Sequence, residues 1–229
     1  MEIKKQNKDV IAGSGYMAPS NVNPLNEALG LYDLGSHQAV DSFSSQLDAS
    51  SHQMLALLVN LGLADSDYLE GWSCQFRINK YNLTPESVGS SGVQLHTDSG
   101  FLTILQDDEN VGGLEEMDKS GAFVDIDPCL GTLLVNLRDV AQAWNNGRLC
   151  NVKHRVQGRE ATVRVWIATF LSGPKQEVVV LEAPPEFVDS EHPRLYVPFT
   201  CEDYRKLRLS TKLQAGEAGE AVAFVRTPS

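Results

Sequence analysis

The chain is constrained most by a series of short apolar runs separated by turn residues, which begins near Trp72 and continues to Leu181. Val, Ile, Leu, Phe and Thr dominate the runs, and Gly, Asp, Asn and Pro stand between them. Short runs of this composition, bounded by turn formers, are typical of β-strands. The predicted strands are 74–81, 93–106, 122–126, 131–137, 151–156, 162–171 and 177–181. Seven or eight such strands predict a mainly β domain, a sandwich or jelly roll, with flanking helices.

Helical patterns flank this β region on both sides. Asn23-Pro24 reads as an N-cap followed by proline at the first helical position, which predicts a helix that ends near Leu31. Thr200 is a suitable cap for a closing helix. The predicted helices are 24–31, 37–47, 53–63 and 200–209. The expected organisation is a helical flank at 1–71, the β domain with its closing helix at 72–213, and a flexible tail at 214–229.

Composition excludes several classes of partner. The 229 residues carry a formal net charge of −11, and an acidic surface repels nucleic acid and anionic membranes. The four cysteines, Cys74, Cys129, Cys150 and Cys201, are scattered, which favours neither a zinc ribbon nor a disulfide framework. The polar start of the chain does not resemble a signal peptide, so we expect a cytoplasmic protein. The oligomeric state stays open.

A candidate metal site lies in the predicted strand at 93–106. His96 and Asp98 are two residues apart, and side chains with this spacing leave the same face of a strand. A single His-x-Asp is usually an ordinary surface hydrogen bond, so a third ligand is needed, and His154 is the best candidate. Two histidines and one carboxylate form the facial triad typical of non-haem Fe(II) oxygenases, which leaves coordination positions open.

An arginine accompanies the predicted triad. If the segments around Gly158 form a hairpin centred on Arg159, then His154 lies opposite Arg164 and both point to the same side. A planar guanidinium can bind the distal carboxylate of 2-oxoglutarate in bidentate fashion. Tyr81 is a second candidate for this co-substrate, although a core aromatic residue explains it equally well. Asn79, on the same face of its strand, is a weaker one.

These residues together resemble a known family. His96-Thr97-Asp98, His154 and Arg164 are similar to the plant-type 2-oxoglutarate- and Fe(II)-dependent dioxygenases, as are Asn79-Lys80-Tyr81 and the stretch 136–148. The resemblance implies a double-stranded β-helix, a distorted jelly roll. It also implies that His96, Asp98 and His154 bind Fe(II), and that Tyr81, Arg164 and Asn79 bind 2-oxoglutarate. Dioxygen and a small-molecule substrate complete the expected partners, with ascorbate as a supporting reductant.

Four further segments resemble the auxin-oxidising subgroup of that family: 9–16, 23–25, 89–96 and 192–199. The resemblance implies the oxidation of a small aromatic acid, indole-3-acetic acid, to 2-oxindole-3-acetic acid. Three alternatives remain. The first is another plant small-molecule hydroxylase, and the second is a family-derived protein that has lost turnover. The third is a cupin-like scaffold without 2-oxoglutarate, in which Arg164 faces solvent.

The sequence departs from the family in three respects. Trp166 stands where the family has a serine two residues after its arginine, so its indole is expected to line the co-substrate pocket and to weaken 2-oxoglutarate binding or rearrange the pocket. Arg138 replaces a usual glycine, and a backbone that needs positive φ would be strained there. We expect surface roles for Arg138 and Arg148. The chain is also short, and the family's N-terminal strands and helix are expected to be missing.

Overall fold

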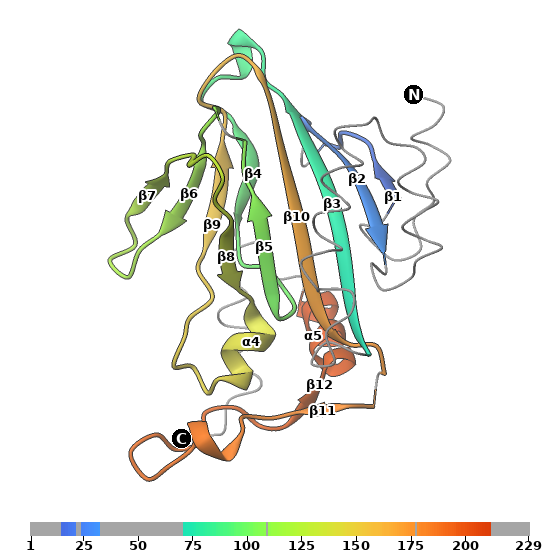
Figure 1. Ribbon diagram of the computed structural model, residues 1–229, viewed down its shortest axis with the longest axis vertical. Coiled ribbons are helices and arrows are strands. Elements are labelled where there is room, and N and C mark those ends of the chain that lie inside the picture. The colour runs from blue at the N-terminus through green and yellow to red at the C-terminus, as the bar shows by residue number, and fades with distance from the viewer. Residues whose placement is uncertain (1–14, 22–23, 33–70, 109, 177, 212–229) are drawn as a thin grey trace.

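A computed structural model describes residues 15–21, 24–32, 71–108, 110–176 and 178–211. In this part of the chain, antiparallel strands form two main sheets (Figure 1). The strands are β1 (Gly15–Met17), β2 (Asn26–Tyr32), β3 (Trp72–Asn82), β4 (Ser91–His96), β5 (Leu102–Gln106), β6 (Leu114–Met117), β7 (Phe123–Ile126), β8 (Leu134–Leu137), β9 (His154–Gln157), β10 (Val163–Pro174), β11 (Val180–Leu181) and β12 (Phe199–Thr200). The helices are α4 (Asp139–Trp144), α5 (Cys201–Thr211) and short 3-10 turns at Pro85–Ser87 and Pro185–Phe187. The predicted mainly β jelly-roll class is confirmed.

The larger sheet has six strands in the order β1-β2-β3-β10-β5-β8. The long strands β3 and β10 run antiparallel at its centre and pair almost from end to end. Successive side chains on a strand alternate between the two faces of its sheet. Arg164, Trp166, Ala168 and Phe170 of β10 therefore share one face. On that face, Arg164 is paired with Tyr81 of β3.

The smaller sheet has the order β4-β9-β6-β7 and lies against the larger one (Figure 1). A core cluster joins the two layers. It combines Tyr81, Leu105, Ala168 and Phe170 from the larger sheet with Leu114 and Val156 from the smaller. Burial of these apolar side chains holds the inner faces of both sheets around one interior.

The segment predicted as a helix at 24–31 is strand β2, so that prediction was wrong. β2 pairs with β3 over seven residues, from Asn26 opposite Tyr81 to Tyr32 opposite Gln75. Ala28 is buried in this arrangement. Local capping signals are weak preferences, and an available sheet edge overrides them. The first seventy residues therefore supply strands to the larger sheet and are not only a helical flank.

The closing helix is present as α5, close to its predicted bounds. The Asp203 backbone N–H donates to Thr200 Oγ1 at 3.1 Å, and the Asp203 carboxylate accepts from the Thr200 backbone N–H, as a cap should. Tyr204 packs against Val140 of α4 in a second core cluster. Helix α5 therefore lies against the segment that follows β8, close to the candidate site.

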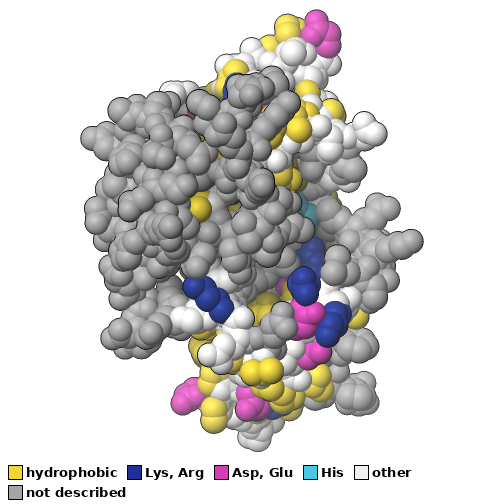
Figure 2. All heavy atoms as spheres, turned by 90° about the vertical axis from the view of Figure 1, so that its right-hand side faces the viewer, with side chains coloured by type: hydrophobic (Ala, Val, Ile, Leu, Met, Phe, Trp, Pro, Cys, Tyr) yellow, Lys and Arg dark blue, Asp and Glu magenta, His cyan; other side chains and the backbone are white. Residues whose placement is uncertain are grey.

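The predicted helices at 37–47 and 53–63 and the tail from residue 214 lie outside the described residues. Within the described part, no helix combines the length and apolar character that a membrane crossing requires. All four cysteines are described and none forms a disulfide. On the face shown in Figure 2, Lys and Arg side chains lie beside Asp and Glu side chains in the lower half of the molecule.

Candidate active site

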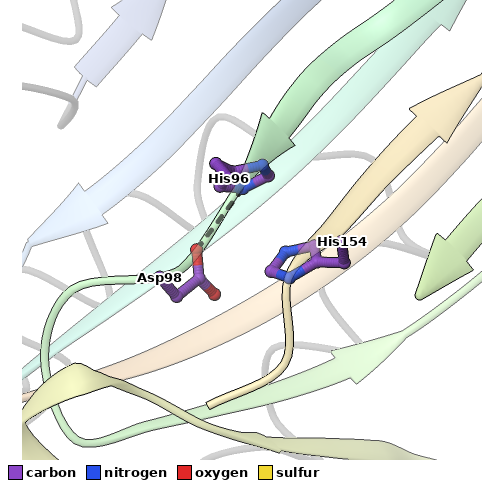
Figure 3. A group of neighbouring side chains, drawn as sticks. All are labelled: His96, Asp98 and His154. Carbon is purple, nitrogen blue, oxygen red and sulfur yellow. Dashed lines mark ion pairs between the residues drawn. The ribbon is translucent and has the colours of Figure 1, made fainter. Parts of the chain in front are cut away.

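Three side chains from two strands and one loop meet at the edge of the smaller sheet. His96 is the last residue of β4 and His154 the first of β9, and the two are direct partners across these strands. Their ring centroids are 4.3 Å apart. Asp98 lies in the loop after β4, with its Oδ1 3.6 Å from His96 Nε2 (Figure 3). The potential ligand atoms of all three residues lie within 4.8 Å of one another, so one ion can contact all three.

Both imidazoles are held in the tautomer that a metal requires. His96 Nδ1 lies 2.8 Å from the carbonyl oxygen of Gln94, and His154 Nδ1 lies 3.1 Å from that of Val152. A carbonyl can only accept, so each Nδ1 carries the proton and each Nε2 keeps a free lone pair. Burial, together with the neighbouring His154, lowers the pKa of His96, against the opposing effect of Asp98. His96 is therefore neutral at neutral pH, and Nε2 of each ring is free to bind a metal.

The second carboxylate oxygen of Asp98 is held by the protein. Thr103 Oγ1 donates to Asp98 Oδ2 at 2.6 Å, and Arg138 Nε lies 3.7 Å from the same oxygen. Burial opposes ionisation of Asp98, but Arg138, the two imidazoles and Thr103 outweigh it and lower the pKa of Asp98 to about 2. The carboxylate is therefore ionised, with Oδ1 directed toward the histidines.

A buried polar network fixes the loop that carries Asp98. The Asp139 backbone N–H and the Asn151 side-chain amide both donate to the Asp98 carbonyl, at 3.1 and 3.0 Å. Asn151 also donates to Asp139 Oδ1 at 2.7 Å. From helix α5, the Tyr204 hydroxyl donates to Asp139 Oδ2, and Arg208 Nη1 donates to it at 3.1 Å. The closing helix is thus connected to the triad through one buried carboxylate.

A second group, which we name the donor cluster, lies on the inner face of β3 and β10 and consists of Asn79, Tyr81, Arg164 and Trp166. Arg164 is directly opposite Tyr81, and Trp166 is directly opposite Asn79. The Arg164, Tyr81 and Asn79 side chains are each about 1% exposed. Each of the four has a buried donor atom without a hydrogen-bond partner among the described residues: Asn79 Nδ2, the Tyr81 hydroxyl, Arg164 Nη1 and Trp166 Nε1. Unpaired buried donors are rare, so this group has the chemistry of a site for a bound acceptor.

Arg164 is also anchored by the protein itself. Its Nε donates to the carbonyl of Val111 at 3.1 Å, and its Nη2 forms an ion pair with Asp107. Burial raises the pKa of Tyr81 to about 12, although the indole N–H of Trp166 and the charge of Arg164 act in the opposite direction. The Tyr81 hydroxyl is therefore protonated at neutral pH and can donate. The scaffold hypothesis with a solvent-facing Arg164 was wrong.

Comparison with known proteins places this geometry in a family. The family model described as the 2OG-Fe(II) oxygenase superfamily matches residues 72–173. The rice protein named 2-oxoglutarate-dependent dioxygenase DAO is 51% identical over 95% of this chain and 78% of its own length. The chain belongs to the 2OG-Fe(II) oxygenase superfamily.

Solved structures agree with this membership. The crystal structure of the rice dioxygenase for auxin oxidation matches this oxygenase with a TM-score of 0.82 and 47% identity, over 99% of this chain and 80% of that one. The complex of the Arabidopsis thaliana dioxygenase for auxin oxidation 1 with 2-oxoglutarate matches with a TM-score of 0.74 and 53% identity, over 84% and 79%. A more distant curated relative, 1-aminocyclopropane-1-carboxylate oxidase 3 of Cucumis melo, is 32% identical over 79% of this chain and 58% of its own length.

Fe(II) and 2-oxoglutarate are the metal and co-substrate of this oxygenase, and its residues fit both. Two imidazoles with a free Nε2 and an ionised carboxylate suit Fe(II). The unpaired donors of the donor cluster suit a carboxylate, which accepts and never donates when ionised. Val156 follows His154 by two residues on β9 and packs in the same core cluster as Tyr81. The triad and the donor cluster therefore face one interior between the two sheets.

Two sequence predictions about strand geometry at this site were wrong. The predicted hairpin does not form, because β9 pairs with β4 and β6 whereas β10 pairs with β3 and β5. His154 is therefore opposite His96 and not Arg164. The predicted strand at 93–106 is two strands, since β4 ends at His96 and Gly100 adopts φ +102 in the loop before β5. Asp98 reaches the site from this loop and not by strand alternation.

Arg138 also differs from its prediction. Its φ of −114° and ψ of 175° are ordinary extended values, so no strain arises there. The side chain is buried, and its guanidinium lies 4.8 Å from the Phe170 ring centroid, beside Asp98. Arg148, by contrast, is at the surface and pairs with Asp189, as predicted. Three contacts at the site are not predicted by the sequence: Thr103 and Arg138 with Asp98, and Asp107 with Arg164. No local signal in the sequence marked them.

Proposed function

We propose that this oxygenase oxidises a small aromatic acid, with indole-3-acetic acid to 2-oxindole-3-acetic acid as the reaction. The convergence of His96, Asp98 and His154 within 4.8 Å carries the proposal, because this set suits Fe(II) and leaves coordination positions open. The rice and Arabidopsis relatives named for auxin oxidation support the choice of substrate. We propose a cytosolic location, in keeping with the acidic chain and its unpaired cysteines.

We assign the residues as follows. His96 and His154 bind Fe(II) through Nε2, and Asp98 binds it through Oδ1, because Nδ1 of each ring and Oδ2 of the carboxylate are engaged by the protein. Arg164 and Tyr81, with Asn79 beside them, hold the distal carboxylate of 2-oxoglutarate. When bound, iron and 2-oxoglutarate together activate dioxygen, with release of succinate and CO2, and one oxygen atom enters the substrate.

The protein's own contribution is orientation and exclusion of water. Thr103 and Arg138 hold one oxygen of Asp98 so that the other faces the imidazoles. The inner faces of both sheets surround the site with apolar side chains, among them Phe170 and Val156. A dry, fixed site favours oxidation of the bound substrate over release of reactive species into water.

The decisive experiment has two stages. Anaerobic Fe(II) is first titrated with and without 2-oxoglutarate, and a visible charge-transfer band that needs both shows chelation at the metal. Indole-3-acetic acid and oxygen are then supplied, and succinate and an oxidised product of one added oxygen atom are measured. His154→Ala removes one proposed ligand and should abolish both signals. A band without oxidation of indole-3-acetic acid would refute the substrate.

One alternative keeps the chemistry and changes the substrate. The more distant relatives named as 1-aminocyclopropane-1-carboxylate oxidases show that related sites serve other small acids. Under this alternative, succinate forms with another small acid and indole-3-acetic acid is not consumed. A panel of aromatic and aliphatic carboxylic acids in the same succinate assay separates the two.

A further inference from the structure

Trp166 occupies a defined place in the donor cluster. It lies two residues along β10 from Arg164, on the same face, and directly opposite Asn79. Its ring is stacked on that of Tyr81, with centroids 6.3 Å apart and an interplanar angle of 27°. The stack orients the indole, so the position of its N–H is fixed by the protein before any ligand arrives.

The indole N–H of Trp166 lies close enough to the Tyr81 hydroxyl to lower the pKa of Tyr81, but it makes no hydrogen bond of ordinary geometry among the described residues. Nε1 is buried and has no hydrogen-bond partner in the part of the chain that the structure describes. The same holds for the Tyr81 hydroxyl and Arg164 Nη1, both on the same patch of sheet. Leaving one such donor unpaired is destabilising, and three of them on one face of the sheet point to one shared acceptor. An indole can only donate, so the bound group must be an acceptor, as a carboxylate is, and cannot be an ammonium.

The charge of Arg164 is already partly matched. Asp107 forms an ion pair with Nη2 of Arg164, and the Asp107 side chain is only 15% exposed. A ligand carboxylate at Nη1 therefore meets a guanidinium with a carboxylate on its other side, and the net attraction is smaller than for an unpaired arginine. Neutral donors next to Nη1 then contribute a larger share of the affinity. Tyr81, directly opposite Arg164, and Trp166, two residues along β10 on the same face, carry such donors.

We propose that Trp166 is a co-substrate-binding residue: its indole N–H, with the Tyr81 hydroxyl and Arg164 Nη1, forms a three-donor site for the distal carboxylate of 2-oxoglutarate. The inference rests on the proposed function, because it assigns a ligand of that same site. It reverses the expectation from the sequence that a tryptophan at this position obstructs binding. The large side chain supplies a donor.

The test compares variants by the equilibrium dissociation constant of 2-oxoglutarate, measured from the charge-transfer band with anaerobic Fe(II), without turnover. Trp166→Phe keeps a ring for the stack on Tyr81 and removes the N–H. We expect it to weaken 2-oxoglutarate binding roughly tenfold to a hundredfold, the loss of a hydrogen bond to a charged group. Trp144→Phe is the matched control, because Trp144 packs between Phe101 and Phe187 outside the donor cluster. This variant should bind 2-oxoglutarate with the dissociation constant of the wild type.

A second ligand distinguishes carboxylate recognition from general damage. 2-Oxopentanoate chelates a metal through the same 2-oxo acid group and lacks the distal carboxylate, so its binding should be equal in the wild type and Trp166→Phe. Equal weakening of both ligands would overturn the proposal, as would unchanged 2-oxoglutarate binding. Tighter binding by Trp166→Ser than by the wild type would also overturn it, since the indole would then be an obstacle. If the wild type itself gives no band with 2-oxoglutarate, the proposed function fails and this assignment fails with it.

Discussion

The hydrogen bond from Thr103 to Asp98 offers a sharp test of how the triad is held. Thr103 is about 5% exposed, and its Oγ1 donates to Asp98 Oδ2 at 2.6 Å. Thr103→Val keeps the shape of the side chain and removes this donor. A hydrogen bond to a charged group contributes roughly 1.5–3 kcal/mol, so the metal-free protein should lose about that much free energy of unfolding. Because the bond also orients a metal ligand, we expect Fe(II) affinity to fall about tenfold to a hundredfold.

Thr169 provides the matched control on the opposite face of the same sheet. It is about 2% exposed, and its Oγ1 has no hydrogen-bond partner among the described residues. Thr169→Val therefore removes a buried hydroxyl that bonds to nothing in the described part of the chain, and it should leave stability unchanged or raise it. Urea unfolding of the metal-free protein gives the stability difference, and anaerobic Fe(II) titration gives the affinity difference.

Unfolding stability and Fe(II) affinity can respond differently to Thr103→Val, and each combination of results has its own meaning. If Thr103→Val behaves like Thr169→Val in both assays, the hydrogen bond to Asp98 is energetically irrelevant. If stability falls while Fe(II) affinity stays at the wild-type value, Thr103 stabilises the loop without positioning Asp98. Either result would refute the reasoning that one carboxylate oxygen is held so that the other can bind the metal.

Three further variants or treatments test other contacts. Gly113→Ala should destabilise the protein by more than about 3 kcal/mol in urea unfolding, because Gly113 has φ +119 and its Cβ would overlap the carbonyl oxygen of Gln157. Tyr204→Phe should lower the free energy of unfolding by roughly 1.5–3 kcal/mol, since its hydroxyl donates to the buried Asp139 carboxylate. Burial raises the pKa of the Cys201 thiol to about 11, so alkylation of Cys201 should be slow at pH 8 and accelerate as the pH rises toward 11.

The glycine and thiol predictions each have an internal control. Gly121 also has positive φ, +86, but nothing lies within 4 Å of the added Cβ, so Gly121→Ala should cost only about 1–2 kcal/mol. If both glycine variants lose the same free energy of unfolding, the overlap between the added Cβ at position 113 and the Gln157 carbonyl oxygen is relieved at no cost. For the thiols, Cys129 and Cys150 are exposed and should react first at pH 8. Peptide mapping that finds Cys201 labelled as fast as these two would contradict the burial argument.

Much of the residue-level description of the site follows from the sequence, because ligand chemistry depends on residue type. The spacing predicts His96 and Asp98, and residue type together with the family resemblance adds His154, Arg164 and Tyr81; the structure gathers all five around one interior. The β class followed from the pattern of apolar runs, which records alternation between the faces of a sheet. The closing helix followed from Thr200 and the pattern after it.

Strand pairing was decided only by the tertiary structure. The alternation of apolar and polar residues along a strand shows which side chains share a face of the sheet. It does not show which other strand pairs with that strand. In this fold the short connection after β9 carries the chain from the smaller sheet to the larger one, so sequence neighbours do not pair. His154 therefore faces His96, and Arg164 faces Tyr81.

The contacts that tune the site come from segments distant in sequence, and for that reason no local pattern predicted them. Asp107 reaches Arg164 across 57 residues, and Arg138, which stands between β8 and α4, reaches Asp98 in the loop after β4. The same holds for strand β2, whose helical capping signal was overridden by the edge of β3. Local preferences are worth tenths of a kcal/mol per residue, whereas a paired and half-buried strand gains more from the sheet it joins.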